Sequence, residues 1–251
     1  MNKFYLLFSF FSVLIILIIL IIYGFYPKTA SILVDEDIED IIEEEILVEE
    51  DTYIFNHLDL DFKTDNSITK FVSPDVPFND KKYIPYDLVN ISWKNIIDRR
   101  WTQTLRKEAL EYLNLLSDSF YEEFNQKLDI ISAYRSYEYQ AWIKARWCSD
   151  YFCAKAWYSE HQSGLAIDFF EATDKKTFLS NNNYKKYYEW LKDNAHKYWF
   201  HNTYRRGRDI DWYEIEPWHW RFVWVEFASY LYEKNLTFAE FIKENNILAP
   251  N

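Results

Sequence analysis

The chain has 251 residues, of which 49% are hydrophobic and 21% aromatic, so it can bury one sizeable core. Its formal net charge of −12, without any basic stripe along the sequence, argues against nucleic acid as a partner. The acidic residues are uneven: eleven lie between Asp35 and Asp51, where there is no Lys or Arg. Much of the charge therefore falls outside the predicted folded domain.

The first element is an apolar run of twenty uncharged residues at 4–23, long enough to cross a bilayer as a helix. We predict a transmembrane anchor there, after a short cytoplasmic start at residues 1–3. A cleaved signal peptide is the alternative, because Lys3 gives a basic start. Against it, the run is longer than the apolar region of most signal peptides, and no small-residue cleavage site follows closely.

Residues 24–78 follow as an acidic stalk that lifts the remaining domain, 79–251, off the membrane. The helical spacing of its isoleucines leaves a partner helix as an alternative. Cys148 and Cys153 are close enough for a small disulfide, which indicates an oxidising compartment; two unrelated buried thiols are the alternative. Anchor and disulfide together predict a single-pass protein of the cell membrane with its folded domain outside the cytoplasm.

The folded part mixes helices and strands without a regular βαβ alternation, so we predict an α+β fold. Apolar residues at steps of three and four indicate a long amphipathic helix at 100–126. The elements after it are strands at 128–133, 165–170 and 218–223, helices at 136–147 and 184–198, and a last helix opened by a capping box at Thr237 and Glu240.

Two stretches carry the side chains of a metal site. His161 and Asp168 flank a turn at Gly164, and His219 stands at the head of a later strand. Three such ligands would hold zinc with one position open for water, whose pKa then falls to about 7. The alternatives are a satisfied core histidine and, for Asp168, a cap at the end of a strand.

Glu216 lies three residues before His219, with Pro217 stiffening the link. A carboxylate so placed can act as general base on the metal's water and then as acid toward the leaving amine. Its alternative is an ion pair with Arg221. His196 and His201 have no comparable surroundings, so we assign them surface or structural roles.

Three blocks of sequence stand out: Ser132-Ala133-Tyr134-Arg135-Ser136 with Gln140, Ser159-Glu160-His161-Gln162-Ser163-Gly164-Leu165-Ala166-Ile167-Asp168, and Glu216-Pro217-Trp218-His219-Trp220-Arg221. Together they resemble the signature blocks of the VanY-type D-alanyl-D-alanine carboxypeptidases. Their order and spacing agree with that family, and the likeness extends from about residue 82 to 232. The resemblance implies the hedgehog/DD-peptidase fold, a small antiparallel sheet flanked by helices, with zinc on its open face.

The resemblance also implies roles for the residues of these blocks. It carries the zinc ligands to His161, Asp168 and His219, and the catalytic base to Glu216. Arg135 would polarise the scissile carbonyl and stabilise the oxyanion. Gln140 and Ser159 match positions that hold the terminal residue of the substrate. The alternatives are an ion pair of Arg135 with Glu138 and a simple turn or cap at Ser159.

The implied activity is that of a zinc metallopeptidase that trims the terminal D-alanine from peptidoglycan stem peptides. Cleavage of the L,D bond of tetrapeptides and endopeptidase action are alternatives within the same class. A cell-wall-binding module that has lost catalysis is the alternative from another class, although pure binding needs no general base such as Glu216.

Glycine and tryptophan are present in unusual numbers. The chain has three glycines and eleven tryptophans, where ordinary usage near 7% would give roughly eighteen glycines. The resemblance leads us to expect glycine at Trp157, Trp199 and Trp224, and also at Trp147 and Trp212. We hypothesise that the source reads the codon UGA as glycine, whereas the sequence is written with tryptophan at these codons. A protein that is truly poor in glycine is the alternative.

Overall fold

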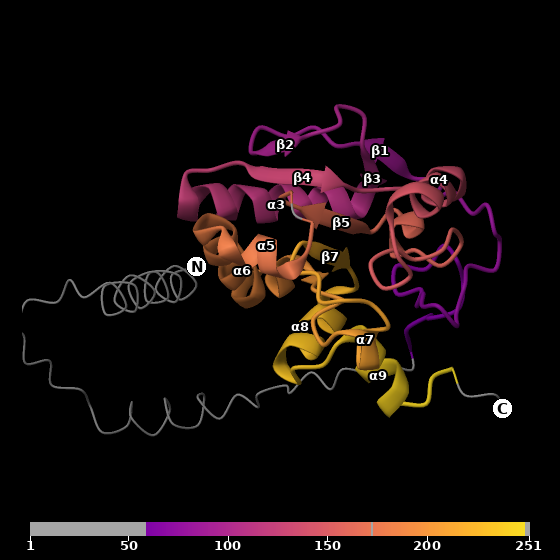
Figure 1. The fold of residues 1–251 in the computed structure, drawn as a ribbon. Helices are drawn as coiled ribbons and strands as arrows, with labels where there is room; N and C mark the ends of the chain where they lie inside the picture. The colour runs from indigo at the N-terminus through magenta and orange to yellow at the C-terminus, as the bar shows by residue number, and fades with distance from the viewer. Residues whose placement is uncertain (1–58, 172, 249–251) are drawn as a thin grey trace, which may run out of the picture. The chain divides into compact units, whose positions relative to one another are not determined.

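The computed structural model describes residues 59–248, apart from residue 172 (Figure 1). The predicted membrane span at 4–23 lies outside the described residues, as does the stalk up to residue 58. Within the part that is described, no helix combines the length and the apolar character needed to cross a membrane.

The central sheet has five strands in the order β2-β4-β5-β7-β6. Their bounds are Ile96–Asp98 for β2, Leu128–Ser132 for β4, Ala166–Phe169 for β5, His219–Phe222 for β7 and Phe200–His201 for β6. The neighbouring pairs among β4, β5, β7 and β6 are antiparallel, but β2 runs parallel to β4. The expectation of an antiparallel sheet is therefore wrong at this one edge. A separate antiparallel pair joins β1 (Leu88–Asn90) to β3 (Thr104–Arg106).

Helices flank the sheet, as the α+β prediction requires (Figure 1). They are α3 (Lys107–Phe124), α4 (Tyr137–Trp147), α5 (Lys175–Ser180), α6 (Asn182–Asn194), α7 (Arg208–Asp211), α8 (Val225–Glu233) and α9 (Phe238–Glu244), with short 3-10 helices η2 (Glu160–Ser163) and η3 (Ala195–Tyr198). The predicted helix at 100–126 begins later, at Lys107, because the preceding residues pair as β3. The buried face of α3, which includes Leu113 and Phe120, packs in the main core with apolar residues of β4, β5 and β7.

A second core cluster lies where α8 and α9 meet the chain before residue 79. The ring of Phe62 contacts that of Phe227 at a centroid distance of 5.8 Å, and Phe71 contacts Phe238 at 5.1 Å. These rings are nearly or fully buried, so their burial contributes about 1.5–3 kcal/mol for each side chain. The folded domain therefore starts before the predicted boundary at residue 79.

Four tryptophans occupy the left-handed backbone region that favours glycine: Trp101, Trp157, Trp199 and Trp212, at φ of 68°, 83°, 67° and 63°. This conformation costs a residue with a side chain about 1–2 kcal/mol. Trp199 ends η3 and Trp212 ends α7 in the C-cap position where glycine is common.

Trp224 and Trp147, the other two positions where glycine is expected, do not have this left-handed backbone conformation. Trp224 has an ordinary φ of −68°, and Trp147 is the last residue of α4. The backbone therefore gives a physical reason for glycine at three of the five named positions, and it adds Trp101, which the family resemblance did not single out.

Candidate active site

The fold brings His161, Asp168 and His219 to one place. Asp168 and His219 lie directly opposite each other on the neighbouring strands β5 and β7. His161 lies in η2, and Gly164 ends that helix at φ 67° before the chain enters β5. A Cβ at Gly164 would come within 2.8 Å of Leu88 Cδ2, so this turn needs glycine for space as well as for conformation.

The ligand atoms of these three residues lie within 4.8 Å of one another, and the two histidines are buried. Asp168 reaches both of them: its Oδ2 is 3.2 Å from His161 Nε2 and its Oδ1 is 3.1 Å from His219 Nδ1. Two imidazole nitrogens and a carboxylate oxygen around one point are a typical donor set for zinc with an open coordination position.

The hydrogen bonds of His161 leave one nitrogen available for a metal. Its Nδ1 lies 2.7 Å from the carbonyl oxygen of Ala133 and donates to it. Nε2 then carries the lone pair, and this buried atom has no hydrogen bond within the described chain. Burial, followed by the charge of Arg135, lowers the pKa of His161 to about 4, so the ring is neutral. A buried lone pair facing a carboxylate fits a cation between them.

His219 is oriented by Glu160, to which the sequence alone gave no role. His219 Nε2 lies 2.8 Å from Glu160 Oε2, so its Nδ1 faces Asp168. Burial lowers the pKa of His219, but hydrogen bonds to Asp168 and Glu160 outweigh it and raise that pKa to about 9. Glu160 is itself buried, and the charge of Arg221 at 3.0 Å helps to bring its pKa down to about 2 against the effect of burial.

The alternative of a Glu216–Arg221 pair is not formed, since Arg221 pairs with Glu160. Glu216 is 7% exposed, and burial raises the pKa of its carboxyl to about 8. The positive charges of His219 and Arg135 oppose this rise in pKa, and the negative charge of Asp168 adds to it. Glu216 is therefore electrostatically coupled to the metal cluster, the name we give to His161, Asp168 and His219.

The segment from Glu216 to His219 is held by Asn202, a second residue that the sequence patterns did not reveal. The Asn202 Nδ2 donates to the carbonyl oxygens of Glu216 at 3.0 Å and His219 at 2.7 Å. The ring of Tyr204 stacks on His219 with centroids 4.6 Å apart. Glu160 was visible as a carboxylate beside a ligand histidine, but nothing in the sequence around Asn202 marks its role.

Arg135 points toward the cluster rather than toward Glu138. Its Nη2 lies 3.7 Å from Asp168 Oδ2, whereas Glu138 pairs with Lys82 at 3.2 Å. The Arg135 Nε is buried and lacks a hydrogen bond in the described part of the chain. The guanidinium is thus a fixed cation beside the cluster with donor capacity left over.

The two residues expected to hold substrate are both buried. Gln140 Nε2 donates to the carbonyl oxygen of Ala154 at 2.7 Å, and its Oε1 has no hydrogen-bond partner among the described residues. Ser159 is 3% exposed and immediately precedes η2. Its hydroxyl makes no capping hydrogen bond to the N-terminus of that helix. The predicted disulfide between Cys148 and Cys153 is present and closes the loop after α4.

Comparison with known proteins agrees with this geometry. Residues 102–225 match the family model of VanY, described as D-alanyl-D-alanine carboxypeptidase. The chain is 33% identical over 178 residues to the putative carboxypeptidase YodJ of Bacillus subtilis, with 64% of this chain and 62% of YodJ covered. It is 29% identical over 114 residues to a D-alanyl-D-alanine carboxypeptidase of Enterococcus faecium, with 45% of this chain and 35% of that protein covered. The chain thus spans less than two thirds of either relative.

Solved structures share the fold. The LD-carboxypeptidase LdcB superposes with a TM-score of 0.58 at 30% identity, over 71% of this chain and 87% of that one. A mutant of the vancomycin resistance D,D-pentapeptidase VanY in complex with Zn(II) superposes with a TM-score of 0.52 at 24% identity, over 68% of this chain and 97% of that one.

Proposed function

The chain belongs to the VanY family of D-alanyl-D-alanine carboxypeptidases, and on this premise we propose that it is a zinc-dependent carboxypeptidase of peptidoglycan stem peptides. The observation that carries the proposal is the cluster of His161, Asp168 and His219, with Glu216 and Arg135 electrostatically coupled to it. The Zn(II) complex of the related VanY supports zinc as the metal.

His161 Nε2, an oxygen of Asp168 and His219 Nδ1 would hold the ion. When bound, zinc lowers the pKa of a coordinated water to about 7 and polarises the substrate carbonyl. A dication in the cluster also favours the ionised form of Glu216, which burial alone disfavours.

Glu216 then takes a proton from the attacking water as the new C–O bond forms. It returns that proton to the amine nitrogen as the C–N bond breaks, which leaves a shortened peptide and free D-alanine. Arg135 provides a fixed positive charge for the oxygen on which negative charge develops. We assign the binding of the terminal substrate residue to Arg135, Gln140 and Ser159.

The choice of bond defines two candidates. The family model and the Enterococcus faecium relative favour a D,D-carboxypeptidase, which removes the terminal D-alanine of a pentapeptide. The likeness to LdcB, an LD-carboxypeptidase, favours removal of the D-alanine of a tetrapeptide.

Release of D-alanine from defined tri-, tetra- and pentapeptides by the zinc-loaded protein tests the proposal. A D,D-enzyme releases D-alanine from the pentapeptide, and an L,D-enzyme releases it from the tetrapeptide. Glu216→Ala should lower the rate about 10²–10⁴-fold, and a chelator should abolish release. Glu138→Ala, an exposed glutamate paired with Lys82, is the matched control and should retain the rate. Binding of peptide without any release would indicate the non-catalytic cell-wall-binding module instead.

We further propose that the domain works outside the cytoplasm, at a membrane to which residues 4–23 anchor it. The disulfide between Cys148 and Cys153 supports an oxidising compartment. Fractionation of cells with the full chain and with a chain lacking residues 1–23 tests this: only the full chain should sediment with membranes. Recovery of both in the soluble fraction would contradict the anchor.

A further inference from the structure

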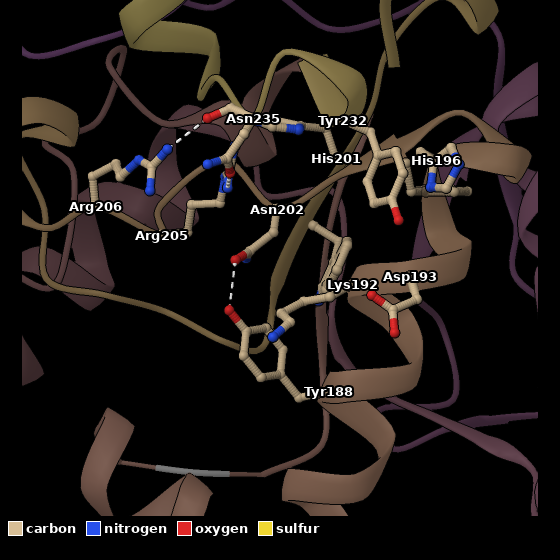
Figure 2. A pocket seen from close by; sticks show the side chains of 12 residues that line it. Tyr188, Lys192, Asp193, His196, His201, Asn202, Arg205, Arg206, Tyr232 and Asn235 are labelled. Carbon is tan, nitrogen blue, oxygen red and sulfur yellow. Dashed lines mark hydrogen bonds between the residues drawn. The ribbon is translucent and has the colours of Figure 1, made fainter. Parts of the chain in front are cut away.

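A pocket lies beside β6, which pairs with β7 at one edge of the central sheet in the part of the chain that the structure describes. It has a volume of about 310 Å³ and is lined by side chains of α6, η3, α8 and the segment after β6. Figure 2 shows Tyr188, Asn202, Arg205 and Lys192 arranged around it. We call it the β6-edge pocket, defined by Tyr188, Lys192, Asn202, Arg205, Arg206 and Asn235.

The charge of the pocket is mostly positive. Lys192, Arg205 and Arg206 line it, and Asp193 is the one acidic side chain among its described lining residues. Two of the three cations already have partners, because Lys192 pairs with Glu189 and Arg206 with Glu240. Of the three cations, Arg205 is therefore the one that forms no ion pair with a described residue.

Arg205 is half-buried and forms no ion pair with any residue that the structure describes. Its Nη1 donates to Asn235 Oδ1 at 2.6 Å, and this bond uses one of the five N–H donors of the guanidinium. Burial, and then the adjacent charge of Arg206, lower the pKa of Arg205. A partly desolvated guanidinium beside a second one favours an anion that accepts from both.

The aromatic side chains that line the pocket indicate a ligand with an organic part as well as a charged group. The rings of Tyr188, Phe200 and Trp220 line the pocket, and His196 stacks on Tyr232 at 3.7 Å between centroids. The space is large enough for an organic group attached to the anion. The Arg205 guanidinium has donors to spare and stands beside two further cations. This suits a phosphate, which presents more acceptor oxygens and more negative charge than a carboxylate.

We propose that the β6-edge pocket binds the phosphate ester of a small polar ligand, with Arg205 as its main anchor. No step of the proposed carboxypeptidase reaction is needed for this, so either proposal can hold without the other. The pocket shares only Asn202 with the active site: Asn202 Oδ1 accepts from Tyr188 at 3.3 Å, while its Nδ2 holds the segment of Glu216.

Calorimetric titration of the zinc-loaded full chain with glycerol 3-phosphate tests the proposal. We expect saturable binding that weakens at least about 10-fold in Arg205→Gln and also weakens as salt is raised. Arg208→Gln is the matched control, because Arg208 lies nearby on α7 but pairs with Glu214 at 2.9 Å; its affinity should equal that of the wild type. Acetate should bind at least about 10-fold more weakly than the phosphate ester.

Two variants distinguish the β6-edge pocket from the metal cluster as the place where phosphate binds. Phosphate held by the metal would be lost in His161→Ala and kept in Arg205→Gln, which would overturn the proposal. Equal affinity of Arg205→Gln and wild type, or no binding at millimolar ligand, would also overturn it. If Arg205→Gln fails to fold, Arg205→Lys takes its place. Lysine keeps the positive charge but lacks the planar, two-pronged set of guanidinium donors, so it should still weaken binding.

The chemical source of the phosphate ester can be tested with the same titration. A glycerol phosphodiester represents a phosphate that links the units of a polymer, and the monoester represents a free phosphate ester. Comparing their affinities identifies which of the two the pocket prefers. Tighter binding of either one supports the site, provided that Arg205→Gln weakens it.

Discussion

Glu160 accepts a hydrogen bond from Nε2 of His219 over 2.8 Å, and this contact fixes which nitrogen of the histidine faces Asp168. Glu160→Gln removes a buried charge that also pairs with Arg221, so Arg221 is left buried and uncompensated. We expect about 3–5 kcal/mol lower stability and about 10–100-fold weaker zinc binding. Thermal melting and competition with a chelator measure the two effects.

Glu189→Gln is the matched control for this change, because Glu189 is exposed and pairs with Lys192 on the surface of α6. It should alter stability by less than about 0.5 kcal/mol. Unchanged zinc affinity in Glu160→Gln would show that the tautomer of His219 does not depend on Glu160.

Removal of the metal should destabilise the domain. Zinc that binds only the folded state, at 100 times its dissociation constant, contributes about 2.7 kcal/mol. A chelator should therefore lower the melting temperature of the wild type, and added zinc should restore it. His161→Ala should melt at the same temperature with and without chelator. His196→Ala, whose ring stacks on Tyr232 outside the cluster, should respond as the wild type does. Insensitivity of the wild type to chelator would argue against a metal at this site.

Asn202 should act as a positioning residue. Asn202→Leu leaves the carbonyl oxygens of Glu216 and His219 without their hydrogen-bond donor. Each buried group left unpaired should lower the free energy of unfolding by about 1–3 kcal/mol. We expect a lower melting temperature and a lower kcat for D-alanine release with little change in KM. Tyr188→Phe removes only the long bond to Asn202 Oδ1 and should have a small effect. Equal kcat in Asn202→Leu and wild type would contradict the role.

His201 should make the domain sensitive to acid. Burial, followed by the charge of Arg205, lowers the pKa of His201 to about 3, whereas an unfolded histidine titrates near 6.5. The unfolded state therefore binds more protons between these values, and stability falls as the pH falls through this range, by up to about 1.4 kcal/mol per pH unit. In His201→Asn the free energy of unfolding should depend less steeply on pH between about 4 and 6. An identical slope in denaturant titrations would show that His201 takes up its proton without unfolding.

The identity of the tryptophans can be read from peptide masses of the protein from its native source. We expect glycine at Trp101, Trp157, Trp199 and Trp212, where φ is positive. Trp190 and Trp218 should be true tryptophans. Tryptophan found at 157, 199 and 224 would end the recoding hypothesis. In a protein made with tryptophan, Trp212→Gly should relieve about 1–2 kcal/mol of backbone strain, less the loss of its contact with Phe71.

Much of the fold followed from local pattern. The predicted strands at 128–133, 165–170 and 218–223 are β4, β5 and β7, each within one or two residues, because a short apolar run bounded by turns has few alternatives. The capping box at Thr237 and Glu240 is present with both of its hydrogen bonds. The strands β1, β2, β3 and β6 were missed, since elements of two or three residues depend on partners elsewhere in the chain.

The candidate site divides in the same way. The metal cluster was predictable because a turn glycine and the alternation along two strands constrain where His161, Asp168 and His219 point. Asn202 and the partnership of Glu160 with Arg221 were not, because they depend on contacts across 14 to 61 residues of sequence that no local pattern encodes. Arg135 lies beside Asp168, and Gln140 is bound to the backbone of Ala154. Their roles toward the substrate stay predictions.

Strand β7 alternates between two environments. His219 and Arg221 meet the carboxylates of Asp168 and Glu160, while Trp220 and Phe222 are buried in the main core. A slip of one residue in its pairing would bury the imidazole among hydrocarbons and turn an indole toward the acids. Only molecules with the correct strand alignment can therefore coordinate the ion, and the molar ratio of bound metal to protein in a preparation should report how many molecules have folded in register.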